Sequence, residues 1–283
     1  MNPYISAFDE GFDVEKSSQY RMTIQFSLGG FSYALLDATK STLIGLECYQ
    51  SDQLTETEEM FRALEKALDS KGLTNKPLLS VTCLIDDRIN TFVPMDLFDE
   101  SKKNDYLEFL FQTSSGQVIL NETLEREKCV NVYALPKSLH TRIISKWDKA
   151  KITHSSTIFI DNAIRYAPEG KVAFVNVKSR SFDLAIIDEG RMVFFNNFRF
   201  NTKDDFAYFL IFALEQNHLS TLKHPVCFSG FILPLSEIVE LCSRYIKYLI
   251  FIEDRKELQV SEALSEVPFQ YYHLHYQTLR CES

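Results

Sequence analysis

The stretch that decides the fold runs from Lys171 to Phe200 and reads KVAFVNVKSRSFDLAIIDEGRMVFFNNFRF. Three apolar runs follow one another there, and two short polar breaks separate them. The first break is Ser179–Arg180–Ser181; the second is Asp188–Glu189–Gly190, whose glycine tolerates the positive φ of a tight hairpin turn. In the middle run apolar and polar side chains alternate, as they do in a half-buried strand. The stretch therefore predicts a three-stranded meander.

A second meander is predicted near the N-terminus, with Gly29–Gly30 at its first turn. We expect its three strands, an amphipathic helix and a buried strand at residues 21–28, 31–37, 42–49, 57–71 and 78–85. The central meander is followed by the same order of helix and strand, and Thr202 is the expected N-cap of the first helix. These later elements are expected at residues 204–216, 226–229, 235–245 and 249–252.

Between the two halves we expect a strand at 129–135, a helix at 137–146, a strand at 151–154 and a helix at 155–166. Residues 1–19 are a lead-in segment that packs through Phe8 and Phe12, and residues 267–276 form a last strand. The same pattern thus occurs twice, about 150 residues apart. It predicts an α/β protein of two similar lobes, 1–168 (with an insertion around 91–121) and 169–283, with a cleft between them.

Composition excludes several classes of protein. The formal charge of −9 and the lack of a basic window argue against a nucleic-acid partner. No apolar segment approaches the ~20 residues that span a bilayer, so direct membrane insertion is not expected. The six cysteines are scattered without a C-x-x-C pair, and the N-terminus lacks a signal-peptide core. A reducing cytoplasm is the expected location, and the oligomeric state stays open.

The duplicated pattern resembles the actin-like ATPase (ribonuclease H-like) superfamily, in which each lobe has a βββαβαβα-type mixed sheet. The segment from YALPKS to FFNNF, residues 133–198, looks like the actin-like proteins of type IV pilus assembly. The opening AFDEGFDVEKSSQYRMTIQFSLGGFSYALLD, with FVPMDLF and VPFQYYHLHY, resembles an uncharacterised family of Bacteroidetes proteins, a domain of unknown function with this fold. The likeness covers nearly the whole chain and implies a fold, not an activity.

Proteins of that superfamily hold phosphate and Mg²⁺ with three motifs. The first is Asp-x-Gly-x-Thr/Ser at the opening turn, and residues 24–32 read IQFSLGGFS in this chain. Gly29, Gly30 and Ser32 remain, but Gln25 and Ser27 supply no anion for a hard cation. The alternative is a Gly-Gly hairpin without a ligand.

The second motif is Asp-x-Gly-Gly-Gly-Thr-x-Asp, and residues 176–183 read NVKSRSFD. Asn176 replaces the acid, and Lys178 and Arg180 replace glycines that expose the backbone to phosphate. Ser181 and Asp183 still match. The alternative is a degenerate turn in which Asp183 is solvated or pairs with Lys178 or Arg180.

The third motif is a strand that ends in Gly-Gly, and in this chain Gly230 is followed by Phe231. Gly230 alone is typical of a turn. Asp37 and Asp161 lie near element ends, yet their spacing does not favour a role as replacement acids. The pair Asp86–Asp87 also lies at an element end, where turn or cap roles suffice.

No catalytic residue and no metal site is predicted. His273 and His275 would project from one face of the expected last strand, but two ligands without a third do not make a zinc site. A sugar-kinase type of enzyme would need a catalytic aspartate near a glycine-rich turn, and the sequence offers none.

We therefore expect a non-catalytic protein without a cofactor that binds another protein or a peptide segment. Resemblance to the pilus-assembly proteins implies a short peptide tail lying along one lobe, and a Phe-rich surface would suit it. The 23 Phe and 13 Tyr residues fit either an aromatic core or such a surface. The alternative is an ATP-binding or weakly hydrolytic protein that uses Mg²⁺ with Gly29, Gly30, Ser32, Ser179, Ser181, Asp183 and Gly230.

Overall fold

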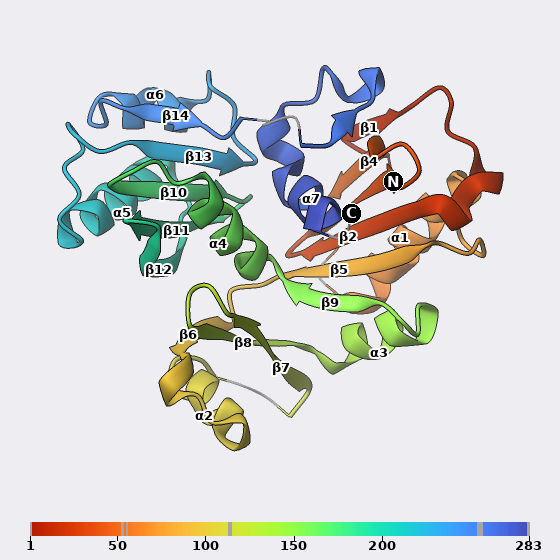
Figure 1. Ribbon diagram of the computed structural model, residues 1–283, viewed down its shortest axis with the longest axis horizontal. Coiled ribbons are helices and arrows are strands. Elements are labelled where there is room, and N and C mark those ends of the chain that lie inside the picture. The colour runs from red at the N-terminus through yellow and green to blue at the C-terminus, as the bar shows by residue number, and fades with distance from the viewer. Residues whose placement is uncertain (1, 52–53, 55, 113–114, 254–256, 282–283) are drawn as a thin grey trace. The chain divides into compact units, whose positions relative to one another are not determined.

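The computed structural model describes residues 2–51, 54, 56–112, 115–253 and 257–281 (Figure 1). The chain packs into two compact units. The first comprises the described parts of Met1–Thr157, Lys256–Val267 and His275–Ser283, and the second those of Ile158–Arg255 and Pro268–Leu274. Each unit has its own sheet and its own apolar core.

The sheet of the first unit has the strand order β1-β4-β3-β2-β5-β9, and β15 pairs with β4. Strands β2, β3 and β4 are antiparallel neighbours, whereas β5 and β9 run parallel to β2. The bounds are β1 (Ile5–Phe8), β2 (Tyr20–Ser27), β3 (Gly30–Asp37), β4 (Thr42–Gln50), β5 (Ser80–Asp86), β9 (Lys151–His154) and β15 (Gln259–Val260).

Helices α1 (Thr57–Ser70) and α3 (Lys137–Lys146) pack on this sheet. The apolar stripe of α1, which includes Phe61, Leu64 and Leu68, is buried in the core. Lys71 is its C-cap, and Gly72 follows with φ +71°. In the lead-in segment Phe8 and Phe12 pack against the same core, as predicted, while β1 and the 3₁₀ helix η1 (Val14–Gln19) are additions.

A smaller three-stranded sheet interrupts the first unit between β5 and α3. Its order is β6-β8-β7, with helix α2 beside it. Val93, Leu107 and Val132 belong to its separate core. The bounds are β6 (Asn90–Pro94), η2 (Met95–Leu97), η3 (Glu100–Lys102), α2 (Lys103–Glu108), β7 (Gln117–Leu124) and β8 (Cys129–Pro136). The sequence Ser114–Ser115–Gly116 in this region is typical of a polar turn, but Ser114 lies outside the described residues.

The second unit repeats the arrangement of the first. Its sheet has the order β12-β11-β10-β13-β14, which matches β4-β3-β2-β5-β9 in both order and direction. The predicted duplicated α/β fold is therefore confirmed. Helix α4 (Ser155–Tyr166) belongs to this unit from Ile158 onwards. The other bounds are β10 (Lys171–Val177), β11 (Ser181–Asp188), β12 (Arg191–Arg199), α5 (Lys203–Gln216), β13 (Val226–Gly230), α6 (Glu237–Ser243) and β14 (Leu249–Phe251).

The predicted cap of α5 is present. The Thr202 side chain accepts a hydrogen bond from the Asp205 backbone nitrogen at 3.1 Å, and the Asp205 carboxylate accepts one from the Thr202 nitrogen at 3.0 Å. This reciprocal capping box satisfies two of the N–H groups that a helix start leaves without partners. It fixes where α5 begins.

The predicted last strand at 267–276 is wrong, because Phe269–Cys281 forms helix α7, preceded by η4 (Glu262–Leu264). Every residue from Tyr272 to Leu279 is buried, so the segment lacks the polar stripe that marks a surface helix. On a helix, residues two apart point about 200° from each other. His273 and His275 therefore do not share a face. In the part of the chain that the structure describes, no helix is long and apolar enough to cross a membrane.

Candidate functional site

In the first unit, the site expected from the sequence is the turn between β2 and β3. Gly29 has φ +76°, which the hairpin requires. A Cβ on Gly30 would lie 2.3 Å from the carbonyl oxygen of Tyr49 on β4. The backbone geometry of the hairpin and the close approach of β3 to β4 are thus enough to explain both glycines.

Ser32 is buried on β3, and its hydroxyl lies 2.8 Å from Nε2 of His275 on α7. His275 is also buried. This hydrogen bond ties the C-terminal helix to the meander within the first unit. It gives Ser32, one of the residues that remain from the first motif, a structural partner.

Asp86 is a buried acid for which the sequence interpretation expected only a turn or cap role. It ends β5, and its carboxylate accepts hydrogen bonds from Gln25 Nε2 at 3.0 Å and from Ser155 Oγ at 2.7 Å. Strands β2, β5 and β9 are parallel, so their carboxyl ends meet at one edge of the sheet. The expected turn role is correct for Asp87, which accepts from two following backbone nitrogens, and wrong for Asp86.

A second set of buried polar groups holds the start of α4. His154 Nδ1 accepts from the Ser156 backbone nitrogen at 3.1 Å, so Nε2 carries the proton that faces the Asp87 carbonyl at 2.9 Å. Nearby, burial raises the pKa of Glu122, although hydrogen bonds from Thr153 and Thr157 oppose the shift. These groups fix the junction of β9 with α4.

In the second unit, the corresponding turn joins β10 and β11. Lys178 Nζ lies 2.8 Å from the Asp183 carboxylate, whose side chain is only 2% exposed. Asn197 Nδ2 donates to the same carboxylate at 2.8 Å and Asn176 Nδ2 at 3.4 Å. The predicted pairing of Asp183 with Lys178 is confirmed, and the solvated alternative is wrong.

The turn itself is closed by backbone hydrogen bonds. The Lys178 nitrogen donates to the Ser181 carbonyl at 2.8 Å, and the Phe200 nitrogen donates to the Arg180 carbonyl at 3.2 Å. Ser179 and Arg180 are exposed, and Ser181 is half-buried. The turn is therefore a regular hairpin connection, with its lysine folded back onto Asp183.

Gly230 ends β13 with φ +85°. A Cβ at this position would lie 2.1 Å from the carbonyl oxygen of Val177, so only glycine lets the two strands pass. The ring of Phe231, the residue in place of the second glycine, packs 5.6 Å from the ring of Tyr271. Gly230 thus serves the packing of β13 against β10.

The described side chains contain no group of three His, Cys, Asp or Glu residues that could hold a metal ion. Asp37 pairs with Tyr20 at the start of β2, the end away from the Gly29–Gly30 turn. Asp161 lies 3.8 Å from Arg165 along α4. Neither acid joins the positions that the superfamily motifs use.

The thiols with described side chains are buried and form no disulfide. Burial raises the pKa of Cys129 to about 11 and that of Cys48, Cys227 and Cys242 to about 12. A thiol with so high a pKa carries almost no thiolate at neutral pH and is a poor nucleophile. These cysteines serve packing.

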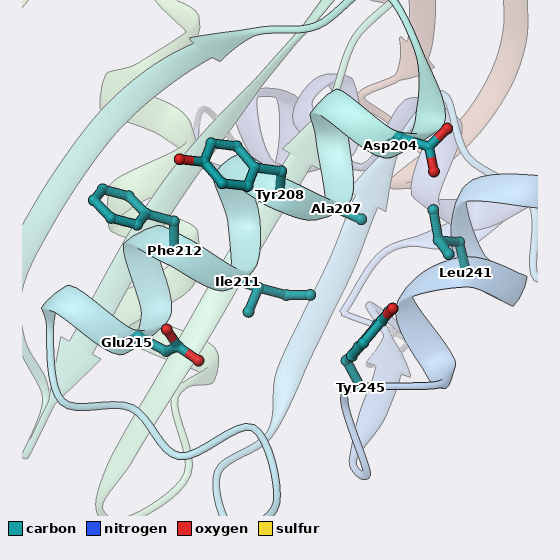
Figure 2. A pocket seen from close by; sticks show the side chains of 8 residues that line it. All are labelled: Asp204, Ala207, Tyr208, Ile211, Phe212, Glu215, Leu241 and Tyr245. Atoms are coloured by element: carbon teal, nitrogen blue, oxygen red, sulfur yellow. The ribbon is translucent and has the colours of Figure 1, made fainter.

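The second unit also has an open groove of about 320 Å³ between α5 and α6, which the sequence interpretation missed. Figure 2 shows Leu241 and Tyr245 facing α5, with Asp204 and Glu215 towards opposite ends of the groove. The available signal was the apolar sequence of α5, which continues onto its outer side. The lining residues are Asp204, Ala207, Tyr208, Ile211, Phe212, Glu215, Leu241 and Tyr245.

Two sheets of the same order, each with its meander and crossover helices, define a protein of the actin-like ATPase fold. The chain belongs to the family described as protein of unknown function (DUF3822), which matches residues 9–249. No curated protein matches it.

Solved structures with the same fold share little sequence with this chain. A Bacteroides thetaiotaomicron VPI-5482 protein with actin-like ATPase fold and unknown function has a TM-score of 0.75 at 17% identity, covering 85% of this chain and 93% of its own. The PilM–PilN type IV pilus biogenesis complex has a TM-score of 0.63 at 10% identity, covering 93% of this chain and 98% of the matched chain. The ethanolamine utilization protein EutJ from Carboxydothermus hydrogenoformans has a TM-score of 0.50 at 10% identity, covering 92% of this chain and 89% of its own. At these identities the similarity establishes the fold.

Proposed function

We propose that this chain is a non-catalytic member of the actin-like fold that acts by binding another protein. The observation that carries the proposal is the ion pair of Lys178 with Asp183, 2.8 Å long and almost fully buried. It neutralises the one acid that the second phosphate motif retains. The proposal includes a cytoplasmic location, because scattered free cysteines suit a reducing compartment.

Phosphoryl transfer depends on a positioned metal ion, neutralisation of charge and an aligned water. Gln25 and Asn176 are neutral where the superfamily has acids, and Asp183 already has a cation as its partner. Gly30 and Gly230 are explained by close backbone contacts. These observations favour a scaffold that has kept the fold and lost the chemistry.

The protein-binding part of the proposal has separate support. One structural neighbour, PilM, was solved as a complex with PilN. In the chain itself, large apolar side chains such as Tyr208, Phe212 and Tyr245 are exposed on the second unit. Contiguous exposed apolar patches are typical of protein interaction sites.

The alternative, an ATP-binding or weakly hydrolytic protein, is favoured by one observation. Asp86 is a buried acid beside Gln25, so the first unit does hold a carboxylate at the carboxyl edge of its parallel strands. Arg180 is exposed and positively charged, and would attract an anion to the second turn. ATP and Mg²⁺ would then be the cofactors.

Thermal unfolding with and without ATP and Mg²⁺ separates the two functions. A ligand that binds only the folded state stabilises it by about 2.7 kcal/mol at one hundred times its dissociation constant. We expect no shift of the unfolding midpoint at millimolar ATP. A saturable rise would contradict the non-nucleotide part of the proposal. An Asp86→Asn variant that abolishes such a rise would assign the binding to the first unit.

A further inference from the structure

Helix α5 has an apolar outer side. Phe206, Leu210 and Leu214 are buried in the core of the second unit, as an amphipathic helix requires. Tyr208 and Phe212, however, are 62% and 48% exposed and stack on each other with ring centroids 6.0 Å apart. A surface helix ordinarily presents polar residues on that side. The outer side of α5 is therefore suited to being covered.

A groove with room for side chains lies beside the outer side of α5. Leu241 and Tyr245 form its opposite wall, and Tyr245 is 53% exposed (Figure 2). Ala207 and Ile211 lie between the walls. Its volume of about 320 Å³ is at the low end for a ligand cleft, which suits the insertion of a few apolar side chains better than a cofactor.

The charges at the groove have one sign. Asp204 and Glu215 belong to its lining and lie eleven positions apart on α5, which corresponds to about 16 Å along the helix. Within the described part of the chain neither forms an ion pair. The neighbouring cations are already paired, Lys203 with Glu237 at 3.0 Å and Arg244 with Glu240 at 2.8 Å.

The charges of the two whole helices add to the negative charge at the groove. Helix α5 holds three carboxylates and α6 holds two, against Lys203 on α5 and Arg244 at the C-cap of α6, so five negative charges face two positive ones. A second copy of this chain, with its formal charge of −9, is disfavoured as the occupant. An occupant with basic ends is favoured, because complementary charge steers association and suppresses wrong partners.

We infer that the groove between α5 and α6 binds an amphipathic helix of a partner protein. The helix has about three turns, apolar side chains at i, i+3/i+4 and i+7, and a lysine or arginine near each end. Its basic residues lie about eleven positions apart, to meet Asp204 and Glu215. This inference rests on the proposed function and adds the place and the chemistry of the partner.

The test uses a fluorescein-labelled peptide of about 18 residues, long enough to form a helix, with this apolar spacing and lysines at both ends. Fluorescence anisotropy with the full chain measures its affinity. A matched peptide carries glutamates in place of the lysines. We expect the basic peptide to bind at least tenfold more tightly than the glutamate peptide. Its affinity should fall when salt rises from 0.1 M to 1 M, because the Debye length falls from about 10 Å to about 3 Å. Equal affinities for the two peptides, or no binding of either, would overturn the inference.

Two double variants locate the binding. Tyr208→Ala with Phe212→Ala, both at exposed positions, should lower the affinity for the basic peptide at least tenfold. Asp204→Lys with Glu215→Lys should reverse the preference towards the glutamate peptide, a gain that a misfolded variant does not give. Phe109→Ala, at an aromatic residue that is 89% exposed in the first unit, is the matched control and should change nothing. Unchanged binding by both double variants would remove the groove as the site.

The peptide experiment and the ATP experiment test different claims, so the failure of one can be told from the failure of the other. Stabilisation by ATP with intact peptide binding would remove only the non-nucleotide part of that proposal. No effect of ATP together with no peptide binding would remove only the groove assignment. A dimer in sedimentation that the Tyr208→Ala/Phe212→Ala variant dissolves would make a second copy the occupant and would overturn the inference.

Discussion

The ammonium nitrogen of Lys178 lies 2.8 Å from the carboxylate of Asp183, and the two side chains are only 12% and 2% exposed. Both residues belong to the β10–β11 hairpin, where Asp183 pairs in register with Asn176. A buried ion pair of this kind is weak support for net stability, but breaking one half of it is costly. The retained Asp183 therefore has a structural reason that does not involve nucleotide.

The first prediction concerns that pair. Lys178→Met should lower the free energy of unfolding by about 3–5 kcal/mol, because it leaves a buried carboxylate without its cation. Urea denaturation measures the loss. Lys171→Met, at the other end of β10 where the pair with Asp188 is more exposed, should cost at most about 1 kcal/mol. Adding Asp183→Asn to Lys178→Met should recover much of the loss, and a double variant no more stable than Lys178→Met would contradict the explanation.

The second prediction concerns activity. Asn176→Asp with Lys178→Gly restores the acid and one glycine of the second motif, yet it should not create ATP hydrolysis, since Gln25 is still neutral. The carboxylate introduced at position 176 would also lie beside Asp183 without a cation, so the variant should unfold at lower urea. Phosphate release assays compare it with the unsubstituted chain. Hydrolysis by this double variant alone would show that the site had kept more of its chemistry than we propose.

The third prediction uses two glycines with the same φ of +85°. Gly170→Ala should cost about 1–2 kcal/mol, the penalty of the left-handed region, because nothing lies within 4 Å of the added Cβ. Gly230→Ala should cost clearly more, because its Cβ would lie 2.1 Å from the Val177 carbonyl. Urea midpoints of the two variants give the comparison. Equal costs would mean that β10 and β13 can separate without loss.

The fourth prediction concerns pH. Burial lowers the pKa of His273 from its ordinary value of 6.5 to about 4, and the hydrogen bond to the Gln270 carbonyl only partly opposes this. Below pH 6.5 the unfolded chain binds a proton that the folded chain does not. The contribution of His273 to stability is therefore complete above pH 6.5 and declines as pH falls towards 4, by up to about 1.4 kcal/mol per pH unit.

His273→Leu should flatten the stability profile in that window, because it removes the imidazole whose pKa differs between the folded and the unfolded chain. Urea unfolding from pH 8 to pH 4 measures the profile of both proteins. Their difference at pH 8, where both side chains are neutral, is the internal reference. Parallel profiles down to pH 4 would show that His273 becomes charged without unfolding.

Much of the fold could be predicted from the sequence. The bounds expected for α3, β9 and α4 agree with the structure, because each element has its own local pattern and begins or ends at a polar residue or a proline. The strand predicted at residues 267–276 was wrong because that segment has no such local pattern. From Tyr272 to Leu279 the side chains of α7 are buried on every side of the helix, so neither a period of two nor one of 3.6 marks the segment.

For the candidate site, the sequence by itself determined which chemical groups are present: neutral Gln25 and Asn176 in place of acids, and Lys178 in place of a glycine. Only the tertiary structure decided which groups meet. Asp183 pairs with Lys178 because β10 and β11 are in register, and Asp86 meets Gln25 because parallel strands bring residues 61 positions apart to one edge. The groove likewise requires α5 and α6 to pack side by side. Local patterns of side chains select helices and strands, whereas a site depends on contacts between segments far apart in the chain, which local patterns do not encode.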